Sequence, residues 1–429
     1  MIDYRGLFLN EWHLERNGQP FNPFMLQPPE TPEERAAVFT GPESDLESAA
    51  SQLLAAPCGI VVHGIFGVGK TMFAYEALRR SEKARAIPVY VSYHSQENFY
   101  LLILREIARA LAERGNDEGK KIDAILRRGE QSLERKTGGE FSPEAAGIRV
   151  GSLGREVTQV EALGIQHPRS EIERLADAIK PGHQRIIIAV DNLERYANEE
   201  QLRQVVNDVK ELQRFGCSVM LIGHPLGVTR NLTSASEGGV FADTILLEPL
   251  SAAQLVEMAT KYLRLARRPN SDLAPTHPFT PIAVRDVAER TVAHNLTPRS
   301  FHYACHFFLE YFSKRGEHLI LPDHLDEGFA ALSRKIGRNL VELEMEDQDI
   351  RYRDIVRATH IQGRLTEEPD DAALESLNTT FLDERPRLVK LEESDVIIGE
   401  TQVDQGGSEI RQYRVNPLLH PEDIDGAPA

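Results

Sequence analysis

Short apolar runs alternate with amphipathic stretches through the first 250 residues of the chain. Five runs have the length and apolar content of buried strands, at residues 59–63, 87–93, 185–190, 218–222 and 244–247. The stretches between them repeat apolar residues at helical spacing, most clearly at 42–55, 71–81 and 97–114. Strands that alternate with helices predict an α/β domain, with a parallel sheet covered by helices on both faces, over residues 41–250.

Two segments break this alternation. Residues 115–170 are richer in glycine and charge and contain a single strand-like piece, 147–151, so we interpret them as an insertion that decorates the sheet domain. Residues 1–40 are rich in proline and aromatic side chains, with Pro28 next to Pro29. Because adjacent prolines forbid helix and favour extended backbone, we expect an arm that packs across a domain surface or reaches a neighbouring subunit.

Helices replace strands after residue 250. Three helical stretches, at 251–266, 280–294 and 298–313, predict a small all-α domain over residues 251–316, and Ser251 with Gln254 forms a capping pattern at its start. The last block, 317–429, has two or three helical stretches up to about residue 382. Strand-like runs follow at 388–391, 396–398 and 410–415. Helices followed by a hairpin predict a winged-helix-like α+β module.

The charge is negative and unevenly distributed. The 429 residues include 66 acidic and 49 basic side chains, a net charge of −17. Residues 317–429 hold 26 Asp and Glu against 12 Lys and Arg, a net charge of −14, which leaves −3 for residues 1–316. This balance excludes a protein that coats nucleic acid by bulk charge. We expect the acidic C-terminal block to face solvent or a protein partner, because phosphate backbones would be repelled.

The sequence indicates a cytoplasmic protein without a membrane segment. The N-terminus lacks the basic-then-apolar order of a secretory signal, and no apolar run approaches the ~20 residues that cross a bilayer. Cys58, Cys217 and Cys305 lie far apart without metal-ligand spacing, which is typical of buried thiols in a reducing compartment. His302 and His306 share a helix face among aromatic residues, so we expect packing rather than a metal site.

Residues 64–71 read GIFGVGKT and match G-x-x-x-x-G-K-[ST] at every position. In this motif glycines let the backbone curl so that N–H groups point at phosphate oxygens, the lysine reaches the β- and γ-phosphates, and the hydroxyl ligates Mg²⁺. The following helix adds its positive end to the same anion. The motif predicts a P-loop NTPase that binds ATP and Mg²⁺ through Gly64, Phe66, Gly67, Val68, Gly69, Lys70, Thr71 and Met72.

A second motif is the apolar strand at 186–190, which ends in Asp191. A carboxylate at this place in P-loop proteins lies beside Mg²⁺, so Asp191 and Thr71 are the expected metal ligands. Asn192 follows, where many such ATPases have a glutamate that activates water; an amide orients water without accepting a proton. Glu194 either replaces that base or is a surface acid paired with an arginine. We therefore expect slow hydrolysis.

Two residues after the next strand are candidates for contacts with the γ-phosphate. His224 lies in Gly-His-Pro directly after the strand at 218–222, and either donates a hydrogen bond to phosphate or caps a turn before Pro225. Arg230 precedes the last strand of the sheet domain. It either reaches a neighbouring subunit's nucleotide as an arginine finger or is an ordinary exposed arginine.

With these motifs the chain resembles AAA+ ATPases over residues 38–316, particularly the branch of origin-recognition initiators and of transposition and secretion ATPases. Phe39-Thr40-Gly41 and the Leu-x-Pro-Leu-Ser junction at 247–251 add to the phosphate loop and Asp191. Leu296-Thr297-Pro298-Arg299 is similar to the turn that opens the sensor-2 helix of the family's lid domain. The resemblance implies that Arg299 contacts the γ-phosphate. Pro42, Asn192 and His224 depart from the family pattern, and the STAND class of signalling NTPases shares most of these features.

The resemblance implies a homo-oligomeric ATPase that uses its nucleotide state to assemble or remodel a DNA-associated complex through partner proteins. The alternative is a STAND-like signalling or defence switch, in which hydrolysis only resets the state. DNA would be bound through a partner or through basic residues of the sheet domain: Lys120, Lys121, Arg127, Arg128, Arg135 and Lys136. Acids interleave with these cations, as on solvated helix surfaces. Transposition, replication, plasmid maintenance and defence all remain open.

Overall fold

The computed structural model describes residues 6–24, 28–84, 86–93, 98–137, 165, 167–182, 184–193, 199–223, 240–347, 349, 351–366, 371–394, 396–403 and 409–424. The chain divides into two compact units. Residues 42–63 and 73–246 form one, here called the sheet unit. Residues 1–41, 64–72 and 247–429 form the other, here called the helical unit.

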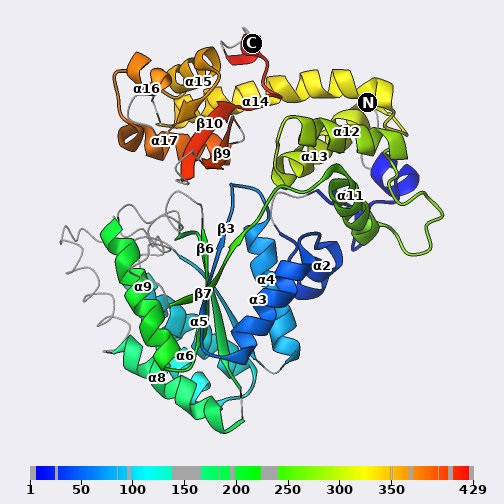
Figure 1. The fold of residues 1–429 in the computed structure, drawn as a ribbon. Coiled ribbons are helices and arrows are strands. Elements are labelled where there is room, and N and C mark those ends of the chain that lie inside the picture. Colours follow the sequence, from blue (N-terminus) through cyan, green and yellow to red (C-terminus); the bar gives the residue numbers. More distant parts are fainter. Residues whose placement is uncertain are drawn as a thin grey trace. The chain divides into compact units, whose positions relative to one another are not determined.

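Within its described residues, the sheet unit contains a five-stranded parallel sheet of order β4-β5-β6-β3-β7. Its strands are β3 (Gly59–His63), β4 (Ile87–Ser92), β5 (Ile186–Asp191), β6 (Ser218–Gly223) and β7 (Phe241–Leu246). The helices are α3 (Glu43–Ala55), α4 (Lys70–Lys83), α5 (Phe99–Glu113), α6 (Asp117–Thr137), α8 (Pro168–Ile179) and α9 (Glu199–Arg214). Figure 1 shows α3 and α4 on one face of the sheet and α5, α6, α8 and α9 on the other. The predicted α/β sheet is confirmed.

The burial of each strand follows from its place in the sheet. Every residue of β3, β5 and β6 is buried, because helices cover both faces of these inner strands. The edge strands β4 and β7 instead alternate between more and less buried positions. On β4 this alternation places Tyr90 and Ser92 on the same face of the strand.

The segment interpreted as an insertion begins with a long helix that packs on the sheet unit. Helix α6 lies against α5 through Ile122 and Leu126, each 2% exposed and part of the main hydrophobic cluster. The sequence pattern was too sparse to predict this helix because charged residues occupy most of its other positions. The strand-like piece at 147–151 lies outside the described residues.

The helical unit holds α11 (Ala252–Ala266), α12 (Pro281–Ala293) and α13 (Pro298–Arg315). Each helix begins after a Ser or Thr whose hydroxyl accepts a backbone N–H, at Ser251, Thr280 and Thr297. Ser251 and Gln254 form the capping box that their spacing predicts. The three predicted helices are therefore confirmed.

The described part of the C-terminal block contains four helices and a small sheet up to residue 415. They are α14 (Leu325–Asp347), α15 (Arg351–Gln362), α16 (Ala372–Ser376), α17 (Phe381–Glu393) and an antiparallel sheet of order β8 (Leu365–Thr366), β10 (Glu409–Val415), β9 (Ile397–Val403). A short helix, α18 (Pro421–Ile424), follows. The predicted hairpin is β9–β10, and the winged-helix assignment stays a prediction.

The strand predicted at 388–391 is wrong, because these residues lie inside helix α17. Leu388 and Leu391 are both fully buried. Residues three apart share one face of a helix, whereas in a strand they would point to opposite faces. The run Leu-Val-Lys-Leu is too short for its periodicity to distinguish the two structures.

The N-terminal segment differs from the extended arm that its prolines predict. It contains a π-helical turn (Leu7–Glu11), a two-stranded hairpin of β1 (Glu15–Arg16) with β2 (Gln19–Pro20), and helix α2 (Pro32–Val38). Its described residues pack against the rest of the helical unit. Trp12 is fully buried and its indole N–H donates to the carbonyl of His318 at 3.0 Å.

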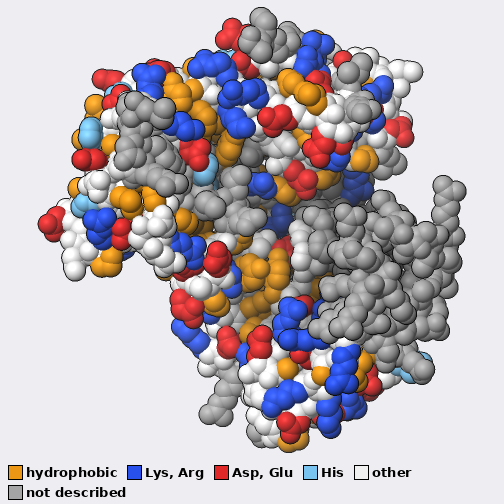
Figure 2. All heavy atoms as spheres, turned by 180° about the vertical axis from the view of Figure 1, so that it is seen from behind, with side chains coloured by type: hydrophobic (Ala, Val, Ile, Leu, Met, Phe, Trp, Pro, Cys, Tyr) orange, Lys and Arg blue, Asp and Glu red, His pale blue; other side chains and the backbone are white. Residues whose placement is uncertain are grey.

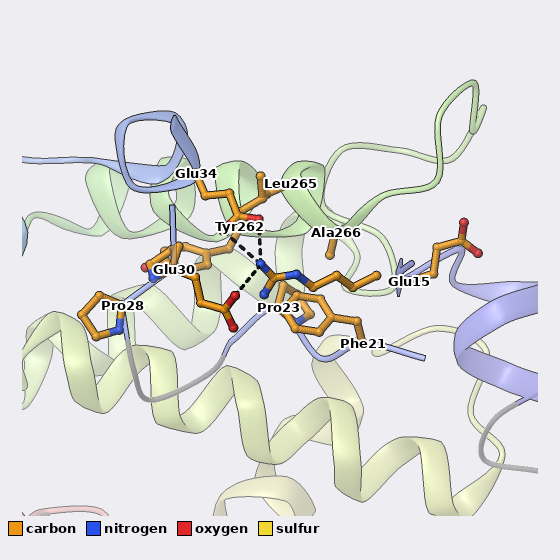
Figure 3. A pocket seen from close by; sticks show the side chains of 11 residues that line it. Glu15, Phe21, Pro23, Pro28, Glu30, Glu34, Tyr262, Leu265 and Ala266 are labelled. Atoms are coloured by element: carbon orange, nitrogen blue, oxygen red, sulfur yellow. Dashed lines mark hydrogen bonds and ion pairs between the residues drawn. The ribbon is translucent and has the colours of Figure 1, made fainter. Parts of the chain in front are cut away.

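A pocket of about 180 Å³ lies where this segment meets α11 (Figure 3). Arg16 bonds to Glu34 at 3.0 Å beside it, and Phe21 and Tyr262 line it.

In the described part of the chain, no helix has both the length and the apolar character to cross a bilayer.

His302 is buried in the same part of the helical unit, between aromatic rings. Its ring centroid lies 5.1 Å from that of Phe24 and 4.6 Å from that of Tyr262. Burial, with a smaller contribution from His306, lowers the pKa of His302 to about 3. His302 is therefore neutral in the folded protein at neutral pH.

We expect His302 to make the protein less stable in mild acid. In the unfolded chain a histidine binds a proton below about pH 6.5, whereas the folded protein excludes it, so stability is complete above that pH and is lost as pH falls toward 3. Wild type should lose up to about 1.4 kcal/mol per pH unit more than His302→Phe. Urea unfolding at pH 7, 6 and 5 measures this difference. Parallel stability curves for the two proteins would contradict it.

Candidate functional site

The loop predicted to bind phosphate follows β3 directly and leads into α4. Gly67 and Gly69 have φ of 77° and 106°, in the left-handed region that glycine adopts without strain. A Cβ atom on Gly67 would also lie 2.7 Å from both Thr297 Oγ1 and Arg299 Cβ. Gly67 is thus required twice, for its backbone conformation and for the close approach of α13.

Lys70 is the first residue of α4, and its side chain folds back over the loop. Its ammonium donates to the carbonyl oxygens of Gly64 at 2.8 Å and Ile65 at 3.1 Å, and the residue is 8% exposed. The same ammonium lies 5.9 Å from the Phe66 ring centroid. A phosphate in the loop would compete with the two carbonyls for these donors. Val68 is buried beneath the loop, and Met72 lies in the first turn of α4.

Arg299 lies against this loop at the start of α13. Its backbone N–H donates to the carbonyl of Gly67 at 3.2 Å, and its guanidinium carbon lies 5.1 Å from the Phe66 ring centroid. Thr297, two residues before Arg299, caps the start of α13 by accepting the N–H of Ser300 at 3.3 Å. The structure therefore brings Arg299 to Phe66, Gly67 and Lys70 of the loop, from which it is separated by more than 220 residues in sequence.

In the sheet unit, Asp191 ends β5 and is 2% exposed. The Tyr90 hydroxyl donates to Asp191 Oδ2 at 2.8 Å, and the backbone N–H of Asn192 donates to Oδ1 at 2.8 Å. Asn192 has a φ of 66°, and its side-chain amide donates to Ser92 Oγ at 2.8 Å. Burial, and then the nearby Asp191 carboxylate, raise the pKa of Tyr90 well above its usual range.

The parallel topology places Asp191 at the edge of the sheet where β3 and β6 also end. The phosphate loop leaves β3 from that edge. Carboxylate and hydroxyl oxygens are the ligands that Mg²⁺ prefers, with phosphates supplying others, so Asp191 and Thr71 have the donor chemistry that this ion needs. Among the described residues, no group of three or more His, Cys, Asp and Glu is arranged to hold a metal.

Three other predicted site residues, Glu194, His224 and Arg230, lie outside the described residues. Sequence reasoning missed Tyr90, Ser92 and Thr297. Tyr90 and Ser92 alternate with buried residues on β4, which is a sequence signal for a shared face. That this face reaches Asp191 depends on β4 pairing with β5, and the sequence alone does not determine strand order.

The basic residues proposed for DNA binding lie on α6 and are largely paired with acids. Lys121 lies 2.8 Å from Glu118, and Arg127 lies 2.8 Å from Asp123. The side chains of Arg135 and Lys136 lie outside the description. Figure 2 shows Lys and Arg interspersed with Asp and Glu among the coloured atoms of the face it displays. This arrangement is the solvated helix surface that the interleaved charges predict.

We expect Gly67→Ala to destabilise the protein more than an alanine at an unobstructed left-handed glycine. Gly363 is the matched control, with φ of 76° and nothing within 4 Å of a Cβ atom. Backbone strain alone should cost about 1–2 kcal/mol at either position. The clash with Thr297 and Arg299 should add about 1–3 kcal/mol for Gly67→Ala. Urea unfolding of both variants measures the cost of backbone strain and the added cost of the clash. Equal losses of unfolding free energy in the two variants would mean that α13 does not pack closely against the loop.

Residues 58–232 match the protein family described as "AAA domain". No match was found among curated proteins.

The chain is similar to several solved structures at low sequence identity. The Aeropyrum pernix ORC1 protein in complex with DNA is 15% identical, with a TM-score of 0.45, over 92% of this chain and 97% of that one. The Cdc6p of Pyrobaculum aerophilum is 13% identical, with a TM-score of 0.42, over 92% and 94%. Drosophila ORC bound to DNA is 15% identical, with a TM-score of 0.43, over 96% and 94%.

Proposed function

We propose that this chain is a Mg²⁺-dependent ATPase whose nucleotide state controls its assembly with other proteins. The match of residues 58–232 to the AAA domain family and the five-stranded parallel sheet support this proposal. The observation that carries the proposal is the curled loop at 64–69, with Lys70 and Arg299 both brought to it. Backbone N–H groups of such a loop and the start of α4 attract a phosphate, and Lys70 supplies the positive charge.

In this proposal hydrolysis is slow. The residue after the metal-binding acid is Asn192, and its amide is already donated to Ser92 at 2.8 Å. An amide cannot take the proton of an attacking water, so this position orients the site rather than activating water. Glu194 is the remaining candidate base. A slow ATPase suits a switch, in which the bound state persists long enough for a partner to recognise it.

The path from nucleotide to partner runs through Arg299 in this proposal. Its guanidinium packs on Phe66 of the loop and also donates to the carbonyl of Glu393, at 3.4 Å, at the end of α17. In the reverse direction, Arg414 of β10 donates to the carbonyl of His294 at the end of α12. Each arginine thus meets the negative end of a helix across the same contact. A phosphate that draws Arg299 away would loosen this contact.

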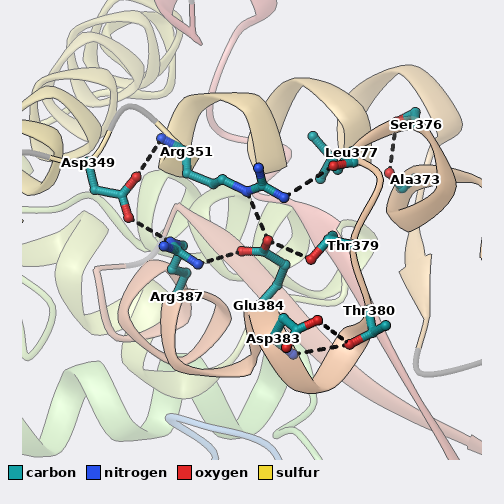
Figure 4. Close-up of polar contacts among 10 residues, drawn as sticks. All are labelled: Asp349, Arg351, Ala373, Ser376, Leu377, Thr379, Thr380, Asp383, Glu384 and Arg387. Carbon is teal, nitrogen blue, oxygen red and sulfur yellow. Dashed lines mark hydrogen bonds and ion pairs between the residues drawn. The ribbon is translucent and has the colours of Figure 1, made fainter.

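A buried ion-pair network holds α17 in place for that role (Figure 4). Glu384 is 1% exposed and accepts from Arg351 and Arg387, each at 2.9 Å. Arg387 also bonds to Asp349 at 2.7 Å. These ion pairs hold the start of α17, since removing either arginine would leave the buried charge of Glu384 less compensated. The C-terminal end of the same helix presents the carbonyl of Glu393 to Arg299.

We further propose that the acidic C-terminal block binds a protein partner, that the chain forms homo-oligomers, and that DNA is reached through the partner. The net charge of −14 over residues 317–429 and the paired cations of α6 support this order of contacts. The second candidate is a STAND-like signalling or defence switch. The commitment of Asn192 to Ser92 favours it, because such a switch needs hydrolysis only to reset.

Lys70→Ala should abolish most nucleotide binding. Loss of a charged donor to phosphate weakens binding by about 1.5–3 kcal/mol, or about 10–100-fold in affinity. The measurement is titration with a fluorescent ATP analogue in Mg²⁺, alongside steady-state ATP hydrolysis. Lys121→Ala, an exposed lysine of α6, is the control and should bind as wild type does. The proposal fails if wild type binds no ATP or if Lys70→Ala binds it equally well.

Steady-state ATP hydrolysis by Glu194→Gln distinguishes the two roles of Glu194. The rate falls if Glu194 is the catalytic base and is unchanged if it is a surface acid.

Arg299→Ala should weaken binding of ATP by about tenfold or more and leave ADP binding nearly unchanged, because the proposed contact is with the γ-phosphate. Competition titrations with ATP and ADP give both affinities. The control is Arg285→Ala, whose guanidinium is exposed on α12 and lies 3.8 Å from Glu289. Equal losses for ATP and ADP would show that Arg299 supports the loop without sensing the γ-phosphate.

A further inference from the structure

The end of β4 holds the turn at Asp191–Asn192 with two side chains. In the sheet register Ser92 lies opposite Asp191, and Tyr90 is two residues earlier on the same face of β4. The Tyr90 hydroxyl donates to Asp191, and the Ser92 hydroxyl accepts from Asn192. Both side chains of the turn are therefore fixed from the neighbouring strand.

Helix α4 supports this arrangement from the other side. The ring of Tyr75 stacks on that of Tyr90, with centroids 4.5 Å apart and planes at 28°. Tyr75 follows Thr71 by four residues on α4, so the two lie on the same face of the helix. Within the sheet unit, Tyr75 thus packs on the ring whose hydroxyl donates to Asp191.

We propose that Tyr90 is a positioning residue for Mg²⁺: its hydroxyl, braced by Tyr75, sets the orientation of the Asp191 carboxylate toward the metal. This inference rests on the proposed function. The Tyr90 hydroxyl donates to one oxygen of the carboxylate and the Asn192 N–H donates to the other, which fixes the plane of the carboxylate. Both are neutral donors, so they orient the carboxylate without cancelling its charge.

Glu384 offers a comparison, because the donors that hold its carboxylate are cationic. Glu384 accepts from the guanidinium groups of Arg351 and Arg387, which neutralise it. A hydrogen-bonded partner that orients a metal ligand typically changes metal affinity 10–100-fold when it is removed. The Tyr90 hydroxyl should therefore affect the metal-dependent part of nucleotide binding, and this is the part that the test isolates.

The test compares Tyr90→Phe with wild type by titration of a fluorescent ATP analogue in EDTA and in saturating Mg²⁺. The substitution keeps the ring that stacks on Tyr75. Tyr100→Phe is the matched control, because Tyr100 donates to Asp208 at 2.9 Å in a phenol–carboxylate pair between α5 and α9. We expect the gain in affinity on adding Mg²⁺ to fall about tenfold in Tyr90→Phe, with affinity in EDTA unchanged. Tyr100→Phe should match wild type in both conditions.

Each other outcome has a definite meaning. An unchanged gain in Tyr90→Phe overturns the role of Tyr90, as does an equal loss of affinity in EDTA and in Mg²⁺. A variant that no longer melts cooperatively without nucleotide also overturns it, because the hydroxyl would then be structural. If wild type itself binds no nucleotide, the proposed function fails instead, and this result is distinct from the other three.

Discussion

The close approach of the loop at Gly67 to the first turn of α13 is the contact on which the rest of the site depends. A hydrogen atom in place of a side chain leaves room for Thr297 and Arg299, and the backbone N–H of Arg299 then reaches the Gly67 carbonyl. The loop is curled, with Gly67 and Gly69 in the left-handed region of φ. Its shape therefore determines where the Arg299 guanidinium lies, against Phe66 and the end of α17.

The sequence predicted best those features whose signal is local. Inner strands such as β5 are apolar at nearly every position, so their run length identifies them, and the phosphate-loop motif specifies its own glycines. Prediction failed where neighbours decide. Helix α6 places only a few apolar residues in the core, so its sequence pattern is weak. The spacing of Leu388 and Leu391 fits a helix or a strand until it is known which face is buried. Tyr90 could not be assigned to Asp191 before β4 was placed beside β5.

The acidic C-terminal block uses many of its few cations internally. Arg351, Arg353, Arg387 and Lys390 each bond to an acid of the same block, namely Glu384, Glu344, Asp349 and Asp347. The surplus of negative charge is therefore left to the other acids of residues 317–429. A negatively charged surface attracts cationic groups and repels anionic ones at a distance, and both effects weaken as salt is added.

The burial of Trp12 has a practical consequence. The chain contains a single tryptophan, and its indole ring is enclosed where the N-terminal segment meets the carbonyl of His318. Tryptophan emission, excited at the long-wavelength edge where tyrosine hardly absorbs, thus originates at one place. A red shift of that emission would signal release of the N-terminal segment specifically, so an unlabelled sample carries its own optical probe of this junction.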